Sequence, residues 1–69
     1  MEVKLAKVWF QEEQKRLVAT VSYREEQPSG VWNSAQVDIF LDWIDSYEEI
    51  KRQAFEKAKA FLLHAASDR

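Results

Sequence analysis

Apolar and polar side chains largely alternate in the segment Gln36-Val37-Asp38-Ile39-Phe40-Leu41-Asp42, which is the clearest structural signal in the chain. Successive side chains of a β-strand point to opposite sides, so this pattern predicts a strand with one buried face. We expect the strand to run from Ala35 to Trp43. Its inward face would hold Val37, Ile39, Leu41 and Trp43, and its outward face Gln36, Asp38, Phe40 and Asp42.

A helix is expected directly after this strand, from about Tyr47 to Ala66. Ser46 and Glu49 have the spacing of a capping box, in which the Ser hydroxyl accepts a backbone N–H and the Glu reaches back. Glu48 and Arg52 form an i,i+4 pair of the favourable order. Apolar residues then recur with a period near 3.6, as in an amphipathic helix. This apolar stripe consists of Tyr47, Ile50, Ala54, Ala58, Phe61, Leu62 and Ala65.

Two more alternating segments, Val3 to Phe10 and Leu17 to Arg24, precede the third strand, and the polar break between them suits a hairpin loop. The only Gly and the only Pro lie together in Gln27-Pro28-Ser29-Gly30, which predicts a turn. The conformation of residues 27–34 is left open. The chain is therefore predicted to be one small α+β domain, spanning 1–69. It would be a three-stranded antiparallel β-meander followed by one long C-terminal α-helix packed on one face.

One helix covers one face of a sheet, so the other face is expected to stay open. Alternation predicts the covered set as Ala6, Val8, Phe10, Leu17, Ala19, Val21, Tyr23, Val37, Ile39, Leu41 and Trp43. It leaves Leu5, Trp9, Val18 and Phe40 on the uncovered side, with Lys7, Thr20, Arg24, Asp38 and Asp42 around them. Isolated apolar residues on a surface are normal. Alternatively, the two large rings with Leu5 and Val18 form a patch that another chain covers.

The residues that commonly carry catalysis or bind metals are scarce. The chain has no Cys, which excludes thiolate zinc sites. Its single His, His64, lies in the last turn of the predicted helix, where a cation interacts favourably with the helix dipole. A chain with one Gly lacks a phosphate-binding glycine loop. Asp38 and Asp42 would stand roughly 13 Å apart along one strand, too far to share a proton. We therefore expect a protein that is not an enzyme, with no catalytic residue, cofactor or metal.

The distribution of charge indicates the kind of partner. Seven acids and no Lys or Arg lie between Glu25 and Ile50, and the net charge is −2. The run can serve solubility and helix capping, or it can form a negative surface that docks on a basic partner. Its sign disfavours nucleic acid. The N-terminus lacks a signal-peptide pattern and no apolar run is long enough to span a membrane, so a cytoplasmic protein is expected.

These features favour a non-enzymatic protein-interaction module, itself a homodimer, that binds a protein partner through an acidic and aromatic sheet surface. An analogy with small acidic proteins of phages and mobile elements agrees with this expectation. Two alternatives stay open: a nucleic-acid-binding domain using the open face or the basic outer face of the helix, and a purely structural accessory subunit. The candidate partner-binding residues are Leu5, Trp9, Val18, Asp38, Phe40 and Asp42.

A chain of this length forms a small core, and oligomerisation is a common support for small cores. The homodimer could stack its open faces or pair its sheet edges. Lys4 and Lys7 would discourage pairing along the first strand, and Asp38 and Asp42 would do so along the third. Stacking of the open faces is therefore the preferred arrangement from sequence.

Overall fold

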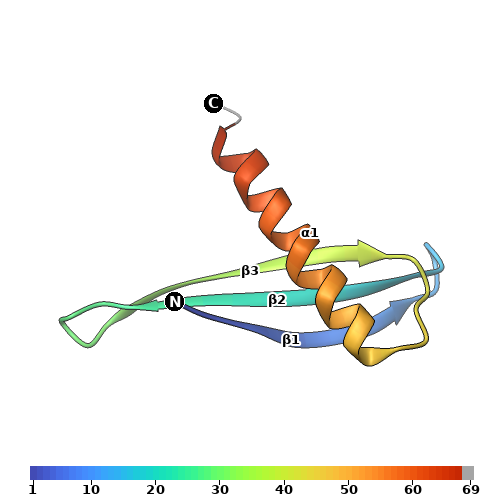
Figure 1. Ribbon diagram of the computed structural model, residues 1–69, viewed down its shortest axis with the longest axis horizontal. Helices are drawn as coiled ribbons and strands as arrows, with labels where there is room; N and C mark the ends of the chain where they lie inside the picture. The colour runs from blue at the N-terminus through green and yellow to red at the C-terminus, as the bar shows by residue number, and fades with distance from the viewer. Residues whose placement is uncertain (68–69) are drawn as a thin grey trace.

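The computed structural model, which describes residues 1–67, confirms the predicted order of elements (Figure 1). Three antiparallel strands in the order β1-β2-β3 form an open sheet in this part of the chain, and one helix crosses one of its faces. The predicted range 1–69 thus extends two residues beyond the described ones. The elements are β1 (Glu2–Gln11), β2 (Arg16–Glu26), β3 (Trp32–Leu41) and α1 (Tyr47–Ser67).

The segment left open by the sequence is a turn followed by strand. The N–H of Gln27 donates to the carbonyl of Val31 at 2.8 Å, and the N–H of Gly30 donates to the carbonyl of Gln27 at 3.0 Å. Gly30 has φ +90°, a conformation that costs a residue without a side chain little. Because this turn closes early, β3 begins at Trp32, opposite Glu26.

The predicted C-terminal end of the third strand was wrong. Leu41 lies opposite Leu17, which is the second residue of β2, so the middle strand offers no partner for Trp43. Trp43 is 65% exposed and not part of the inward face. Its ring packs edge-on against Phe10 at 6.0 Å between centroids, and its Nε1 donates to Asp45 at 2.6 Å.

A β-bulge in β1 changes which side chains face α1. Leu5 pairs with Val21 and Lys7 pairs with Thr20, so Ala6 is an extra residue in the first strand. Simple alternation fails across a bulge, because two residues of one strand oppose one of its neighbour. Leu5 therefore lies on the helix side, where it packs against the core, and Ala6 is exposed. The prediction that Leu5 belongs to the open face was wrong.

The core lies between α1 and the strands. On the helix, Ala54 and Ala58 are completely buried and Ile50 is nearly so. Alanine side chains allow the helix axis to approach the sheet closely, and larger residues fill the space at the sides. Leu5, Val8, Tyr23, Ile44, Phe55 and Leu62 pack around this centre. The sheet contributes Leu17, Ala19, Val21, Val37, Ile39 and Leu41.

At the N-terminus of α1, the structure contains one of the two hydrogen bonds of the predicted capping box. The N–H of Glu49 donates to the Ser46 hydroxyl at 3.3 Å, and the N–H of Ile50 donates to the Ser46 carbonyl at 3.0 Å. The side chain of Glu49 does not complete the box. It accepts instead from Arg52 Nε at 3.0 Å and from Gln53 at 3.2 Å. Arg52 also pairs with Glu56, so the predicted pairing with Glu48 was wrong.

The helix-terminal ion pair makes a pH-dependent contribution to stability. The pKa of Glu49 falls from its ordinary value of 4.5 to about 2, chiefly because Arg52 donates to the carboxylate and secondarily because Gln53 does. The unfolded chain takes up this proton at higher pH than the folded one. The contribution is therefore present above pH 4.5 and is lost as the pH falls toward about 2. It is small, because exposed pairs are screened by water and salt.

We expect Glu49→Gln to flatten the acid limb of the stability profile. Melting temperatures of wild type and Glu49→Gln should converge as the pH falls through this window, because protonation removes the same carboxylate charge in the wild type. Glu48→Gln, a substitution at the neighbouring exposed residue, is the matched control. Equal convergence in both variants would show that general acid effects, and not the pair with Arg52, set the profile.

Candidate functional site

The open face, defined as the side of the sheet opposite α1, carries one apolar row across all three strands. Directly opposed residues of an antiparallel sheet lie on the same side, and Trp9 and Phe40 both lie opposite Val18. Val18 is only 3% exposed although no helix covers this side among residues 1–67, because a ring flanks it on each strand. Phe40 is 44% exposed. The prediction that these three residues share the open face is confirmed.

A polar row lies next to the apolar one. Lys7, Thr20 and Asp38 are opposed across the three strands, one position further along the same face. The Thr20 hydroxyl donates to Asp38 Oδ1 at 2.6 Å, which satisfies a hydroxyl that is otherwise buried. Asp38 is thereby held over the middle strand beside Phe40. The side chain of Lys7 packs on its strand neighbour Trp9, with Nζ 4.7 Å from the centroid of the ring.

The sixth candidate residue, Asp42, lies outside the sheet. It is exposed and follows the last residue of β3, so strand alternation does not extend to it. The predicted line of Asp38, Phe40 and Asp42 on one strand face is therefore reduced to its first two members. Leu5 is also lost from the site, because the bulge moves it to the helix side.

The sequence-based prediction missed a second aromatic group on the open face. Trp32 opens β3 on the same side as Phe40, because the two residues are an even number of positions apart on one strand. Trp32 is 52% exposed, and the guanidinium carbon of Arg24 lies 3.8 Å from the centroid of its ring. A prediction that the third strand begins at Trp32 would have placed Trp32 and Arg24 together on this face. The start of that strand depends on where the preceding turn closes.

The seven acids between Glu25 and Ile50 do not form one surface. Glu25 and Glu26 end β2 at one end of the sheet, whereas the helix start lies at the other end (Figure 1). Several of these acids also have local partners. Asp38 accepts from Thr20, Asp45 accepts from Trp43, and Glu49 binds Arg52. The charge of the open face is mixed and not uniformly acidic. The register places Lys4, Lys7, Arg16 and Arg24 there together with Glu2, Glu26 and Asp38.

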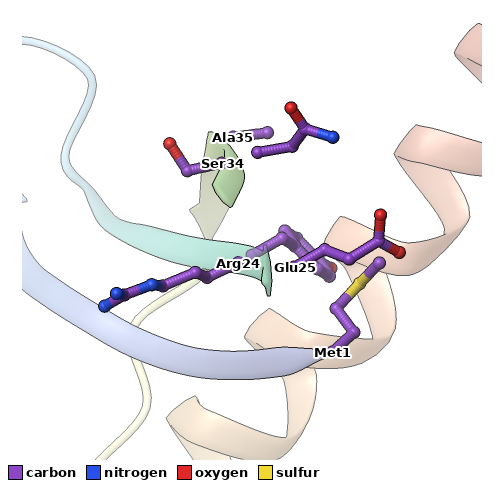
Figure 2. A pocket seen from close by; sticks show the side chains of 7 residues that line it. Met1, Arg24, Glu25, Ser34 and Ala35 are labelled. Carbon is purple, nitrogen blue, oxygen red and sulfur yellow. The ribbon is translucent and has the colours of Figure 1, made fainter. Parts of the chain in front are cut away.

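A shallow pocket of about 170 Å³ lies at the end of the sheet near the β2–β3 turn. Figure 2 shows Met1 and Glu25 projecting toward the side on which α1 lies, whereas Arg24 projects away from it. Pockets that enclose small ligands are typically ~300–1,000 Å³. This hollow is smaller, and it marks the part of the helix side that α1 leaves bare. Its lining is Met1, Tyr23, Arg24, Glu25, Asn33, Ser34 and Ala35.

Two further features concern the helix. His64 is exposed in its last turn, as expected from the sequence. Within residues 1–67, α1 is too polar to cross a lipid bilayer.

Comparison of the chain with protein-family profiles, with curated proteins and with solved structures finds no match in any of the three, so its function is argued from the residues described above.

Proposed function

We propose that this chain is a non-enzymatic protein-interaction module that self-associates and binds a protein partner on its open face. The row of Trp9, Val18 and Phe40 supports this proposal. Interfaces concentrate binding energy in a few central aromatic side chains that become buried, surrounded by a polar rim. Here two rings flank a packed Val, and a fixed carboxylate adjoins them.

The polar neighbours define the chemistry of the partner. Asp38 is oriented by Thr20 and can accept from a basic or amide group, and Lys7 beside Trp9 can meet a carboxylate. The matching surface would present an apolar side chain to Phe40 and a donor to Asp38. A partner of mixed charge therefore fits better than the basic partner that the acidic run suggested.

We expect Phe40→Ala to abolish capture of the partner while the domain stays folded. Truncating a central ring removes contacts at the interface, whereas a ring that faces away from the helix contributes little to the core. The measurement compares proteins retained from lysate by wild type, by Phe40→Ala and by Leu63→Ala. Leu63 is a matched control because it is 63% exposed on the helix. The proposal is supported by a band that Phe40→Ala loses and Leu63→Ala keeps.

Thermal unfolding of the same variant separates binding from stability. If Phe40 were part of a core beneath Trp32 or Val31, its loss would cost about 3–5 kcal/mol. The structure places Trp32 at the other end of β3, opposite Glu26. We expect a melting temperature near that of wild type, and a large decrease would refute the interface role of Phe40.

Single-stranded nucleic acid is a second candidate, favoured by one observation. The open face carries two rings, Trp9 and Trp32, each covered by a cation, and exposed rings with nearby cations can stack bases and hold phosphates. The net charge of −2 opposes this function, and Arg52 on the outer helix is bound by Glu49 and Glu56. Saturable binding of a short oligonucleotide that weakens as salt rises would place this function first.

A further inference from the structure

The two edges of the sheet differ in how well they resist pairing with another chain. Natural sheets protect edges with bulges and with charged side chains, especially Lys. β1 has both, a bulge at Ala6 and the cations Lys4 and Lys7. β3 pairs with β2 in unbroken register along all its ten residues, and its stretch from Trp32 to Val37 is uncharged. β3 is therefore the edge that is ready to accept another strand.

The acids that were expected to protect β3 do not do so. Asp42 lies beyond the end of the strand, and the carboxylate of Asp38 is drawn toward β2 by Thr20. The ground for preferring stacked open faces over paired edges is thereby removed.

The helix extends past this same edge. Figure 1 shows α1 crossing the sheet and continuing beyond β3 with its C-terminal part. Ala54 and Ala58 of its apolar stripe are fully buried, but Phe61, the next member, is 55% exposed. The stripe thus emerges from the core at this turn of the helix, where Leu62 is the last member that still packs against it. We call residues 61–67 the overhang.

The sheet has a bare region that matches the overhang. On the helix side, Val3, Tyr23 and Ala35 form a row across the three strands, and Tyr23 at its centre is only half-buried against the core. Figure 1 shows that α1 does not overlie the end of the sheet beside the β2–β3 turn. Val3 is 42% exposed and Ala35 is also exposed. The shallow pocket of Figure 2 lies here, lined in part by Tyr23 and Ala35. The chain thus has an apolar part of its helix that no strand of its own covers, and an apolar part of its sheet that its own helix does not cover.

We propose that two copies of this chain pair β3 with β3 in antiparallel register, and that each overhang covers the bare region of the other copy. The inference rests on the self-association included in the proposed function. A two-fold axis perpendicular to the sheet keeps both helices on one side and yields a continuous sheet through both copies. The rotation carries each overhang from beyond its own β3 edge onto the partner's strands.

Directly opposed residues of antiparallel strands share a face, so the two-fold axis must lie beside a single residue of β3. That residue then faces the same residue of the second copy. In the proposed dimer it is Ser34, Ala35 or Gln36. With Ala35 at the axis, Asp38 lies opposite Trp32 of the second copy, and like charges are kept apart. The open face with Trp9 and Phe40 stays free for another partner.

Cysteine cross-linking tests the register. The chain contains no Cys, so a single introduced thiol has only its own copy as a protein partner. Residues facing each other across antiparallel strands have Cα atoms about 4.5–5.5 Å apart, which a disulfide can span. We expect Ser34→Cys, Ala35→Cys or Gln36→Cys to yield a disulfide-linked dimer under mild oxidation. Lys4→Cys on the β1 edge is the control, and equal cross-linking there would overturn the inference.

Sedimentation equilibrium tests the overhang. We expect wild type to be a dimer at tens of micromolar, and Phe61→Asp to raise the dissociation constant at least about tenfold, because it places a charge in the proposed interface. Leu63→Asp, on another side of the same helix turn and 63% exposed, should leave the constant unchanged. Circular dichroism verifies that both variants are folded.

The outcomes separate this inference from the open-face proposal. A monomer throughout overturns the inference together with the self-association in the proposed function, but it leaves partner capture by Phe40 intact. Dissociation by Trp9→Ala, with Phe61→Asp still dimeric, also overturns it, because that pattern identifies stacked open faces. Dissociation by Phe61→Asp, with Trp9→Ala still dimeric, supports it.

Discussion

Leu41→Ala is expected to lower the free energy of unfolding by about 2–5 kcal/mol. Leu41 has no exposed surface and lies opposite Leu17 at the end of β3, within the cluster that contacts α1. Truncation removes buried methyl groups and leaves a cavity, and both effects destabilise the folded state. A single small core seldom supplies more than ~3–5 kcal/mol, so this variant should be close to unfolded at room temperature.

Chemical denaturation followed by Trp fluorescence measures this effect. Leu63→Ala is the control, because it deletes the same atoms from a side chain that is 63% exposed. A loss below about 1 kcal/mol for Leu41→Ala would mean that the surrounding side chains collapse into the space, and the arrangement of the core would then have to be revised.

Ala54→Leu is expected to destabilise the domain by about 1–3 kcal/mol, although it adds apolar surface. Ala54 is completely buried where α1 lies against the sheet, with Ile50 and Ala58 one turn away on either side. A Leu at this position forces the helix away from the strands or into an unfavourable rotamer. The expected change is therefore opposite in sign to that predicted from hydrophobicity alone.

The comparison with Ala60→Leu isolates the effect of packing. Ala60 lies on the same helix but is exposed, so the same substitution there should change stability by less than about 0.5 kcal/mol. Stabilisation by Ala54→Leu would show that space remains between helix and sheet. Because the overhang is continuous with this part of α1, a displaced helix should also weaken the proposed dimer.

Local features of the sequence predict most of the fold. The alternation around Asp38 identifies β3, the 3.6-residue period identifies α1, and Ser46 marks where the helix begins. Each depends on residues within a few positions of one another, and the structure confirms all three. The same alternation places Trp9, Val18 and Phe40 on one face, because no irregularity interrupts these parts of their strands.

Features that depend on residues far apart in the chain could be read from the tertiary structure alone. The bulge at Ala6 moves Leu5 to the core, and it arises from the pairing of β1 with β2. β3 ends at Leu41, and Trp43 has no partner because β2 begins at Arg16, the residue that faces position 42. The overhang of Phe61 likewise follows from where the sheet ends, since the helical period itself continues. Periodicity specifies which side of an element is apolar, whereas the register and the angle of packing determine what that side meets.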